Sequence, residues 1–179
     1  MLGLIKKKRQ PRTVNTSRGH YFIGQTDALI MEGQKQNAWG GLYNPAESGI
    51  AVVIDTFTVS NFSSQFFNVE MWVNPKLTGK GTTSSFLHPA DLSLNPLPQP
   101  RVNLQYASQI TENPIGGVNV MNRIVPPNST FMSDSGKSGI TIPPGGSVAI
   151  FLRSPGPFKY ESRIVFRWWE DAIEVGGPQ

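Results

Sequence analysis

The stretch that decides the fold is Phe67-Asn68-Val69-Glu70-Met71-Trp72-Val73-Asn74, where apolar side chains recur at every second position. Successive side chains of an extended chain point to opposite faces, so a period of two places one set on each face. Phe67, Val69, Met71 and Val73 therefore share a face. The pattern predicts a β-strand that buries this face in a core.

A second strong strand signal lies upstream, at residues 50–59 (IAVVIDTFTV). This run begins apolar on both faces and becomes apolar on one, which is typical of a central strand. Further short runs rich in Val, Ile, Phe, Thr and Trp lie between clusters of Gly, Pro, Asn and Ser. They predict strands at residues 21–23, 28–31, 42–43, 102–106, 118–125, 129–132, 140–141, 147–153 and 163–169.

Many short strands without an amphipathic helix between them favour an antiparallel sandwich over a parallel α/β sheet. We predict an all-β fold: a single antiparallel β-sandwich, jelly-roll-like, with an extended N-terminal arm. Residues 74–100 contain five prolines and are predicted as a long loop, with at most edge strands or a single helical turn near residues 89–92. The order of the strands is left open by these patterns.

Length and composition limit the possible classes of protein. The chain has 179 residues, which fits one domain of average size, and 38% of them are hydrophobic, enough for a core. The absence of cysteine excludes a disulfide scaffold and thiolate metal ligands. The longest apolar run, residues 50–54, is far shorter than a membrane-spanning helix. At the N-terminus the apolar residues precede the basic ones, the reverse of a cleavable signal peptide.

The positive charge of the chain is concentrated at its N-terminus. Six of the sixteen basic residues lie within residues 1–18, and the first acidic residue is Asp27. Residues 19–179 carry ten basic and twelve acidic residues, a net charge of −2. We therefore divide the chain into a basic arm with an apolar tip, residues 1–18, and a β-sandwich domain, residues 19–179. The domain itself has no overall positive charge that would attract a nucleic acid.

The arm has three possible partners: nucleic acid, an anionic membrane surface, or a neighbouring subunit that buries its apolar tip. We expect contacts with another subunit, which makes a homo-oligomer with head-to-tail assembly the favoured arrangement. Whether the arm inserts into its own domain or a neighbour is left open. The residues expected to make these contacts are Met1, Leu2, Leu4, Ile5, Lys6, Lys7, Lys8, Arg9 and Arg12.

Signals for catalysis, metals or cofactors are weak. The two histidines, His20 and His88, are 68 positions apart, and neither has a metal-ligand partner at close spacing. Residues 79–81 and 136–138 resemble phosphate-binding loops, but each lacks the leading glycine and a following helix. We expect no enzyme activity, no cofactor, no metal and no small-molecule substrate.

The terminal strand carries two adjacent tryptophans, Trp168 and Trp169, which must point to opposite faces. One of them therefore leaves the core, and we expect Arg167 and Trp169 to form a subunit contact on the body. The tryptophans and tyrosines could instead form a platform on which sugar rings stack, as in a carbohydrate-binding module.

Four segments together carry a resemblance to known proteins: GHYFIGQT at 19–26, IPPGGS at 142–147, VAIFL at 148–152 and RIVFRWWED at 163–171. They resemble a family of small uncharacterised proteins from spore-forming Gram-positive bacteria, to which no activity is assigned. The predicted architecture is also similar to the jelly-roll subunits of endospore appendages. That resemblance implies docking of an N-terminal extension on the next subunit. This chain lacks the cysteines that cross-link such subunits.

These observations predict a non-enzymatic structural subunit that self-assembles into an extracellular fibre or a cell- or spore-surface appendage. One alternative is a viral or phage jelly-roll capsid protein whose basic arm faces nucleic acid, a contact possible only through the arm. A second alternative is a carbohydrate-binding module.

Overall fold

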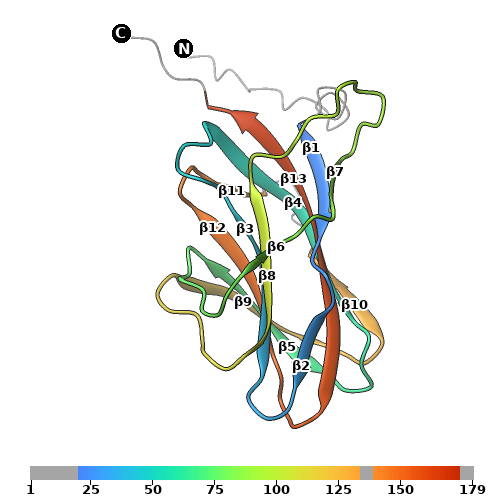
Figure 1. Ribbon diagram of the computed structural model, residues 1–179. Helices are drawn as coiled ribbons and strands as arrows, with labels where there is room; N and C mark the ends of the chain where they lie inside the picture. The colour runs from blue at the N-terminus through green and yellow to red at the C-terminus, as the bar shows by residue number, and fades with distance from the viewer. Residues whose placement is uncertain (1–19, 134–138, 174–179) are drawn as a thin grey trace, which may run out of the picture.

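The computed structural model describes residues 20–133 and 139–173, and this part of the chain contains thirteen β-strands and no helix (Figure 1). Sheet A has the order β10-β4-β13-β1-β7, with β11 also pairing with β4 and β2 with β13; sheet B has the order β6-β8-β3-β12-β5-β9. Both sheets are antiparallel, which confirms the predicted β-sandwich. The strands are β1 (Tyr21–Gln25), β2 (Leu29–Glu32), β3 (Asn37–Tyr43), β4 (Ile50–Asn61), β5 (Phe67–Val73), β6 (Thr82–Thr83), β7 (Leu87–Pro89), β8 (Asn103–Ile110), β9 (Val118–Val125), β10 (Ser129–Met132), β11 (Ile140–Ile142), β12 (Ser147–Arg153) and β13 (Lys159–Ala172).

Along the chain, the strands outside residues 74–117 occupy eight positions, because β1 with β2, and β10 with β11, each fill one position. These eight positions pair from the outside inward, as a nested hairpin. The first position, β1 with β2, pairs with the last, β13, and the second, β3, pairs with β12. The third, β4, pairs with β10 and β11, and the fourth, β5, pairs with β9. One long hairpin rolled into two sheets in this way is a jelly roll. The structure thus supplies the strand order that the sequence left open.

The core lies between the sheets and follows the period of two seen in the sequence. In β5, Phe67 and Val69 are fully buried, which confirms the apolar face predicted there. Opposite them, β13 contributes Ile164, Phe166 and Trp168, each with 0% exposure. This packing supplies most of the hydrophobic stabilisation, because the largest apolar side chains are the ones removed from water.

Strand β3 is longer than the two residues predicted at 42–43, because Gly40 and Gly41 interrupt the sequence pattern without interrupting the strand. Gly40 faces the core, where a Cβ atom would lie 2.6 Å from Thr26 Cγ2 and 3.1 Å from Ile164 Cδ1. The glycine therefore allows sheets A and B to approach closely at this point.

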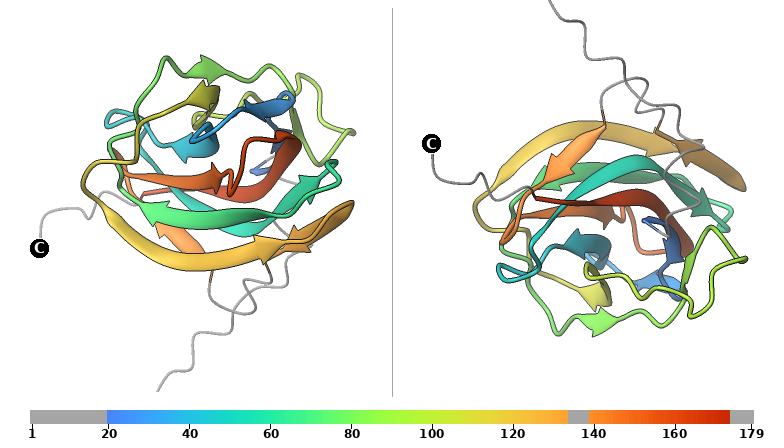
Figure 2. Two further views of the ribbon diagram at one scale, coloured as in Figure 1. Left: turned by 90° about the horizontal axis from the view of Figure 1, so that it is seen from below. Right: turned by 90° about the horizontal axis from the view of Figure 1, so that it is seen from above.

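Residues 74–117 form an insertion between β5 and β9. The insertion adds β7 to one edge of sheet A, and β6 and β8 to the edge of sheet B on the same side. The end-on views in Figure 2 show the insertion along one side of the sandwich and the β9–β10 connection along the opposite side. The short strands β6 and β7 are both edge strands, as predicted for the proline-rich stretch at 74–100, and the helical turn is absent.

Candidate assembly surface

An apolar groove lies on the outside of sheet A, beside the edge strand β7. Its volume is 590 Å³, and we call it the edge groove. It is lined by Ile23, Gly24 and Gln25 of β1, residues 85–90, Leu92, and Val165 of β13.

The alternation of β1 creates the floor of the edge groove. Phe22 points into the core and is 2% exposed, whereas Ile23 points outward and is 36% exposed. Gly24 faces inward, where a Cβ atom would lie 2.7 Å from Leu87 Cδ2. The missing side chain leaves room for Leu87 to pack against the core, and β7, which pairs with β1, forms one wall.

The other walls leave large apolar side chains in water. Phe86 is 50% exposed and Leu92 is 73% exposed. The walls of the edge groove are therefore both apolar and exposed.

The backbone of β7 adds a second recognition element. Within the described residues β7 has one hydrogen-bonded neighbour, β1. Gln25 N donates to Phe86 O at 3.0 Å, and Ala90 N donates to Tyr21 O at 2.8 Å, so alternate residues of this segment point their polar groups toward β1. The intervening residue Leu87 points its N–H and C=O groups away from β1, where an added strand could bond to them.

Few charges surround the edge groove. Of the described residues that line it, His88 is the only titratable one, and its Nδ1 lies 2.8 Å from Pro89 O. Asp91 follows the lining segment, and the Ser93 hydroxyl and backbone N–H both donate to its Oδ1, at 2.6 and 2.9 Å. These hydrogen bonds hold the pKa of Asp91 below its usual value.

The predicted body contact lies next to the edge groove. Arg167 is exposed on β13 and is directly opposite Ile23 in the sheet. Trp168 enters the core and Trp169 takes the opposite face, as expected, but Trp169 is only 9% exposed. Its ring packs on Tyr21 with a centroid distance of 4.3 Å, so Trp169 contributes to packing within the subunit. The sequence could not show this contact, because it depends on the register of β1 against β13.

The predicted arm contacts Met1, Leu2, Leu4, Ile5, Lys6, Lys7, Lys8, Arg9 and Arg12 all lie outside the described residues. The edge groove itself was not predicted from the sequence. Ile23, Phe86 and Leu92 come from three separate segments, and only the fold brings them together.

A second exposed edge lies on the opposite side of the sandwich, at β9 of sheet B. Strand β9 has eight residues, and Val118, Val120 and Ile124 are each more than half exposed. Two features protect this edge from pairing: Arg123, the only charged residue of β9, is exposed, and the register against β5 shifts at Met71/Trp72.

Other polar side chains of the described residues make hydrogen bonds within the subunit. His20 Nδ1 lies 2.7 Å from the backbone oxygen of Glu170, and residues 20–133 and 139–173 hold no group of three side chains that could bind a metal. Glu70 accepts hydrogen bonds from Trp72 Nε1 and Arg153 Nε, each at 2.9 Å. No helix in the described part of the chain is long and apolar enough to cross a membrane.

The fold and this surface define a class of protein: a jelly-roll β-sandwich that carries an apolar groove beside a sheet edge. The sequence model of one family matches residues 9–175, and the chain belongs to that family, DUF6143, a family of unknown function. No curated protein and no solved structure matches the chain.

Proposed function

We propose that this protein is a non-enzymatic structural subunit that assembles with copies of itself into a fibre or surface appendage outside the cell. In this proposal the arm of one subunit, residues 1–18, docks in the edge groove of the next. The observation that carries the proposal is the edge groove, an apolar recess beside β7, whose outer edge has no strand partner among the described residues. Such a site suits an extended segment, because main-chain hydrogen bonds give affinity and side-chain pockets give specificity.

The tip of the arm has the composition that the edge groove requires. Leu2 and Leu4 are two positions apart, so an extended tip presents both to the same surface. Gly3 between them lies on the opposite face of an extended tip, so it does not compete with the two leucines for the edge groove. Docking of the tip would then remove the exposed Phe86 ring and the exposed Leu92 side chain from water.

Charge and reach both allow the arm to dock on a neighbour. The arm carries six basic residues and no acid, whereas residues 19–179 have a net charge of −2. Nineteen residues precede His20, and an extended segment of that length spans about 60 Å, much longer than one strand of the sandwich. One arm and one groove per subunit form a head-to-tail contact. Repetition of this contact generates an open filament when the rotation between neighbouring subunits does not close into a ring.

The first experiment compares the full chain with a variant lacking residues 1–18, by negative-stain electron microscopy and sedimentation velocity. We expect filaments from the full chain and folded monomers from the truncated one. Assembly that is unchanged by the deletion would refute a role for the arm, and a monomeric full chain would refute the structural role.

A pair of groove variants tests the docking site. Phe86→Asp places a charge in the edge groove and should abolish filaments. Phe62→Asp is the matched control, because Phe62 is 56% exposed and lies outside the groove, and it should leave them intact. Equal loss of assembly in both variants would contradict docking at this groove. If Val120→Lys abolishes filaments and Phe86→Asp does not, the contact lies at β9 instead.

Mixing two inactive variants tests docking between subunits directly. The truncated chain keeps its groove and lacks the arm, whereas Phe86→Asp keeps its arm and lacks a functional groove. If the arm docks on a neighbour, the mixture should give a one-to-one complex, although neither variant associates alone. Absence of this complex would contradict docking between subunits.

The capsid alternative predicts a different result from the same samples. A basic arm that packages nucleic acid would bind it with an affinity that falls steeply as salt is raised, because bound counterions are released on association. Closed shells that form only with added nucleic acid would favour that alternative over a filament.

A further inference from the structure

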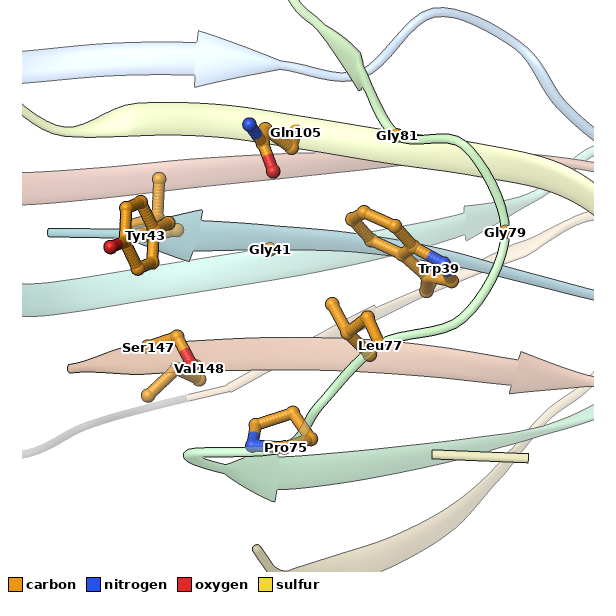
Figure 3. Close-up of a pocket in the computed structure, with 11 residues that line it drawn as sticks. Trp39, Gly41, Tyr43, Pro75, Leu77, Gly79, Gly81, Gln105, Ser147 and Val148 are labelled. Carbon is orange, nitrogen blue, oxygen red and sulfur yellow. The ribbon is translucent and has the colours of Figure 1, made fainter. Parts of the chain in front are cut away.

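A second groove lies on the outside of sheet B, between β3, β8, β12 and the segment 75–81. Its volume is 390 Å³, which is within the range of about 300–1,000 Å³ typical of small-molecule sites. Figure 3 shows Trp39 and Tyr43 at its two ends, with Gly41 between them and the 75–81 segment alongside. We call it the Trp39–Tyr43 groove.

The floor of this groove follows from the alternation of β3. Trp39, Gly41 and Tyr43 are two positions apart and share the outer face. A Cβ atom at Gly41 would lie 2.7 Å from Val148 O, so this position excludes any side chain and the floor stays at backbone level. The two aromatic residues are therefore separated by a flat surface.

The end formed by Trp39 is rigid. Trp39 is 3% exposed, its Nε1 donates to Thr78 O at 3.0 Å, and it packs in a cluster with Phe151 and Ile110. Gly81 allows the 75–81 segment to lie against it, since a Cβ atom there would be 3.0 Å from the indole ring. The groove is thus formed before any ligand binds, which lowers the entropy cost of binding.

Three polar side chains line the groove on β3 and on the strands that flank it, without using their hydrogen-bonding groups. Gln105 is directly opposite Gly41, and Ser147 is directly opposite Tyr43, so all three polar side chains lie on the same face. Within the described residues the Tyr43 hydroxyl, the Gln105 amide and the Ser147 hydroxyl make no hydrogen bond to protein. Tyr43 is 41% exposed, so its ring is accessible.

The chemistry of the lining restricts the ligand. Among the described residues that line the groove there is no Asp, Glu, Lys, Arg or His. A phosphate or carboxylate would find no cationic partner, and a cation would find no carboxylate. An aromatic ring beside neutral donors and acceptors instead suits a ligand with one apolar face and several hydroxyl groups.

We propose that the Trp39–Tyr43 groove binds a neutral saccharide. The C–H face of a sugar ring lies on the Tyr43 ring, and its hydroxyl groups bond to the Gln105 amide and the Ser147 hydroxyl. The groove is on sheet B and the edge groove is on sheet A, so this site is independent of the assembly proposed above and can be tested whether or not that proposal holds.

The test is saturation-transfer-difference NMR, which observes the ligand and therefore works with either monomers or filaments of the full chain. The probes are cellobiose, N,N′-diacetylchitobiose and lactose, with glucuronic acid as a charged counterpart. We expect transfer to at least one neutral disaccharide, with the weakest transfer to glucuronic acid. No transfer to any of the three disaccharides would overturn the proposal, as would the strongest transfer to glucuronic acid.

Two variants assign the binding to the groove. Tyr43→Ala should weaken affinity about tenfold, because it removes the stacking surface. Gln105→Ala should weaken it several-fold through the lost hydrogen bonds. Phe62→Ala and Gln65→Ala are the matched controls outside the groove and should bind as the unmodified chain does. Binding that survives both groove substitutions would place the saccharide elsewhere and refute the assignment.

Discussion

Glu170 holds the insertion onto the sandwich, and its removal gives a large, calculable loss of stability. The residue is 5% exposed at the end of β13. Its Oε1 accepts hydrogen bonds from the backbone N–H of Arg101 at 3.0 Å and of Val102 at 3.2 Å. The same oxygen accepts from Trp168 Nε1 at 3.2 Å, and Oε2 also accepts from Arg101 N at 3.1 Å. One carboxylate therefore satisfies three N–H groups.

Glu170→Ala leaves these three donors without an acceptor. The N–H groups of Val102 and Trp168 are buried, and an unsatisfied buried donor costs about 1–3 kcal/mol, so the free energy of unfolding should fall by about 2–6 kcal/mol. Glu170→Gln keeps one carbonyl oxygen in place of Oε1 and loses the charge, so its loss should be about 1–2 kcal/mol.

Urea unfolding followed by tryptophan fluorescence measures both losses, with the unmodified chain and Glu112→Ala as references. Glu112 is exposed, and its substitution should change the free energy of unfolding by less than about 0.5 kcal/mol. The expected order of stability is the unmodified chain with Glu112→Ala, then Glu170→Gln, then Glu170→Ala. Equal stability of the two alanine variants would show that the hydrogen bonds at Glu170 contribute nothing, and would refute the reasoning.

Three further predictions concern packing and charge. Gly40→Ala should lower the free energy of unfolding by about 1–3 kcal/mol in the same urea assay, because the new methyl group would lie 2.6 Å from Thr26 Cγ2. Trp168→Ala should lower it by about 3–5 kcal/mol, since Trp168 is fully buried. Ser93→Ala should raise the pKa of Asp91 toward its usual value, as read by an NMR titration of the carboxyl carbon. Because that pKa is lowered by folding, the stabilisation from this contact is present at neutral pH and is lost as the pH falls through the folded-state pKa of Asp91.

The sequence predicted the parts of the fold that depend on local alternation. The buried face of β5 was predicted because a period of two is visible within seven residues. The opposite orientations of Trp168 and Trp169 were predicted for the same reason. Strand β3 was predicted only in part, because the space that Gly40 and Gly41 leave for other strands is a long-range property.

Neither groove could be predicted from local sequence patterns alone. The edge groove combines side chains from β1, β13 and the insertion, and the nested pairing that joins them does not appear as any sequence spacing. The Trp39–Tyr43 groove did leave a signal, an aromatic residue on either side of a glycine at every second position. That signal becomes interpretable only once residues 37–43 are known to be one strand.

Both grooves have walls formed by the same insertion. The two grooves are therefore linked through the insertion and not through the jelly roll itself. The eight paired positions form the sandwich without residues 74–117, whose strands only extend its edges. Residues 75–81 form a wall of one groove on sheet B, and residues 85–90 with Leu92 form walls of the other on sheet A. Glu170 accepts hydrogen bonds from Arg101 and Val102, which lie within the insertion just before β8. Loosening that anchor should therefore disturb the nearby edge groove more than the Trp39–Tyr43 groove, whose wall is held by the hydrogen bond from Trp39 to Thr78. In Glu170→Ala, amide hydrogen exchange should accelerate in residues 90–101, whereas in residues 75–81 the Lys76 N–H, which donates to Ile115 O at 2.9 Å, should keep its protection. Equal acceleration in both segments would show that the insertion responds as one unit instead.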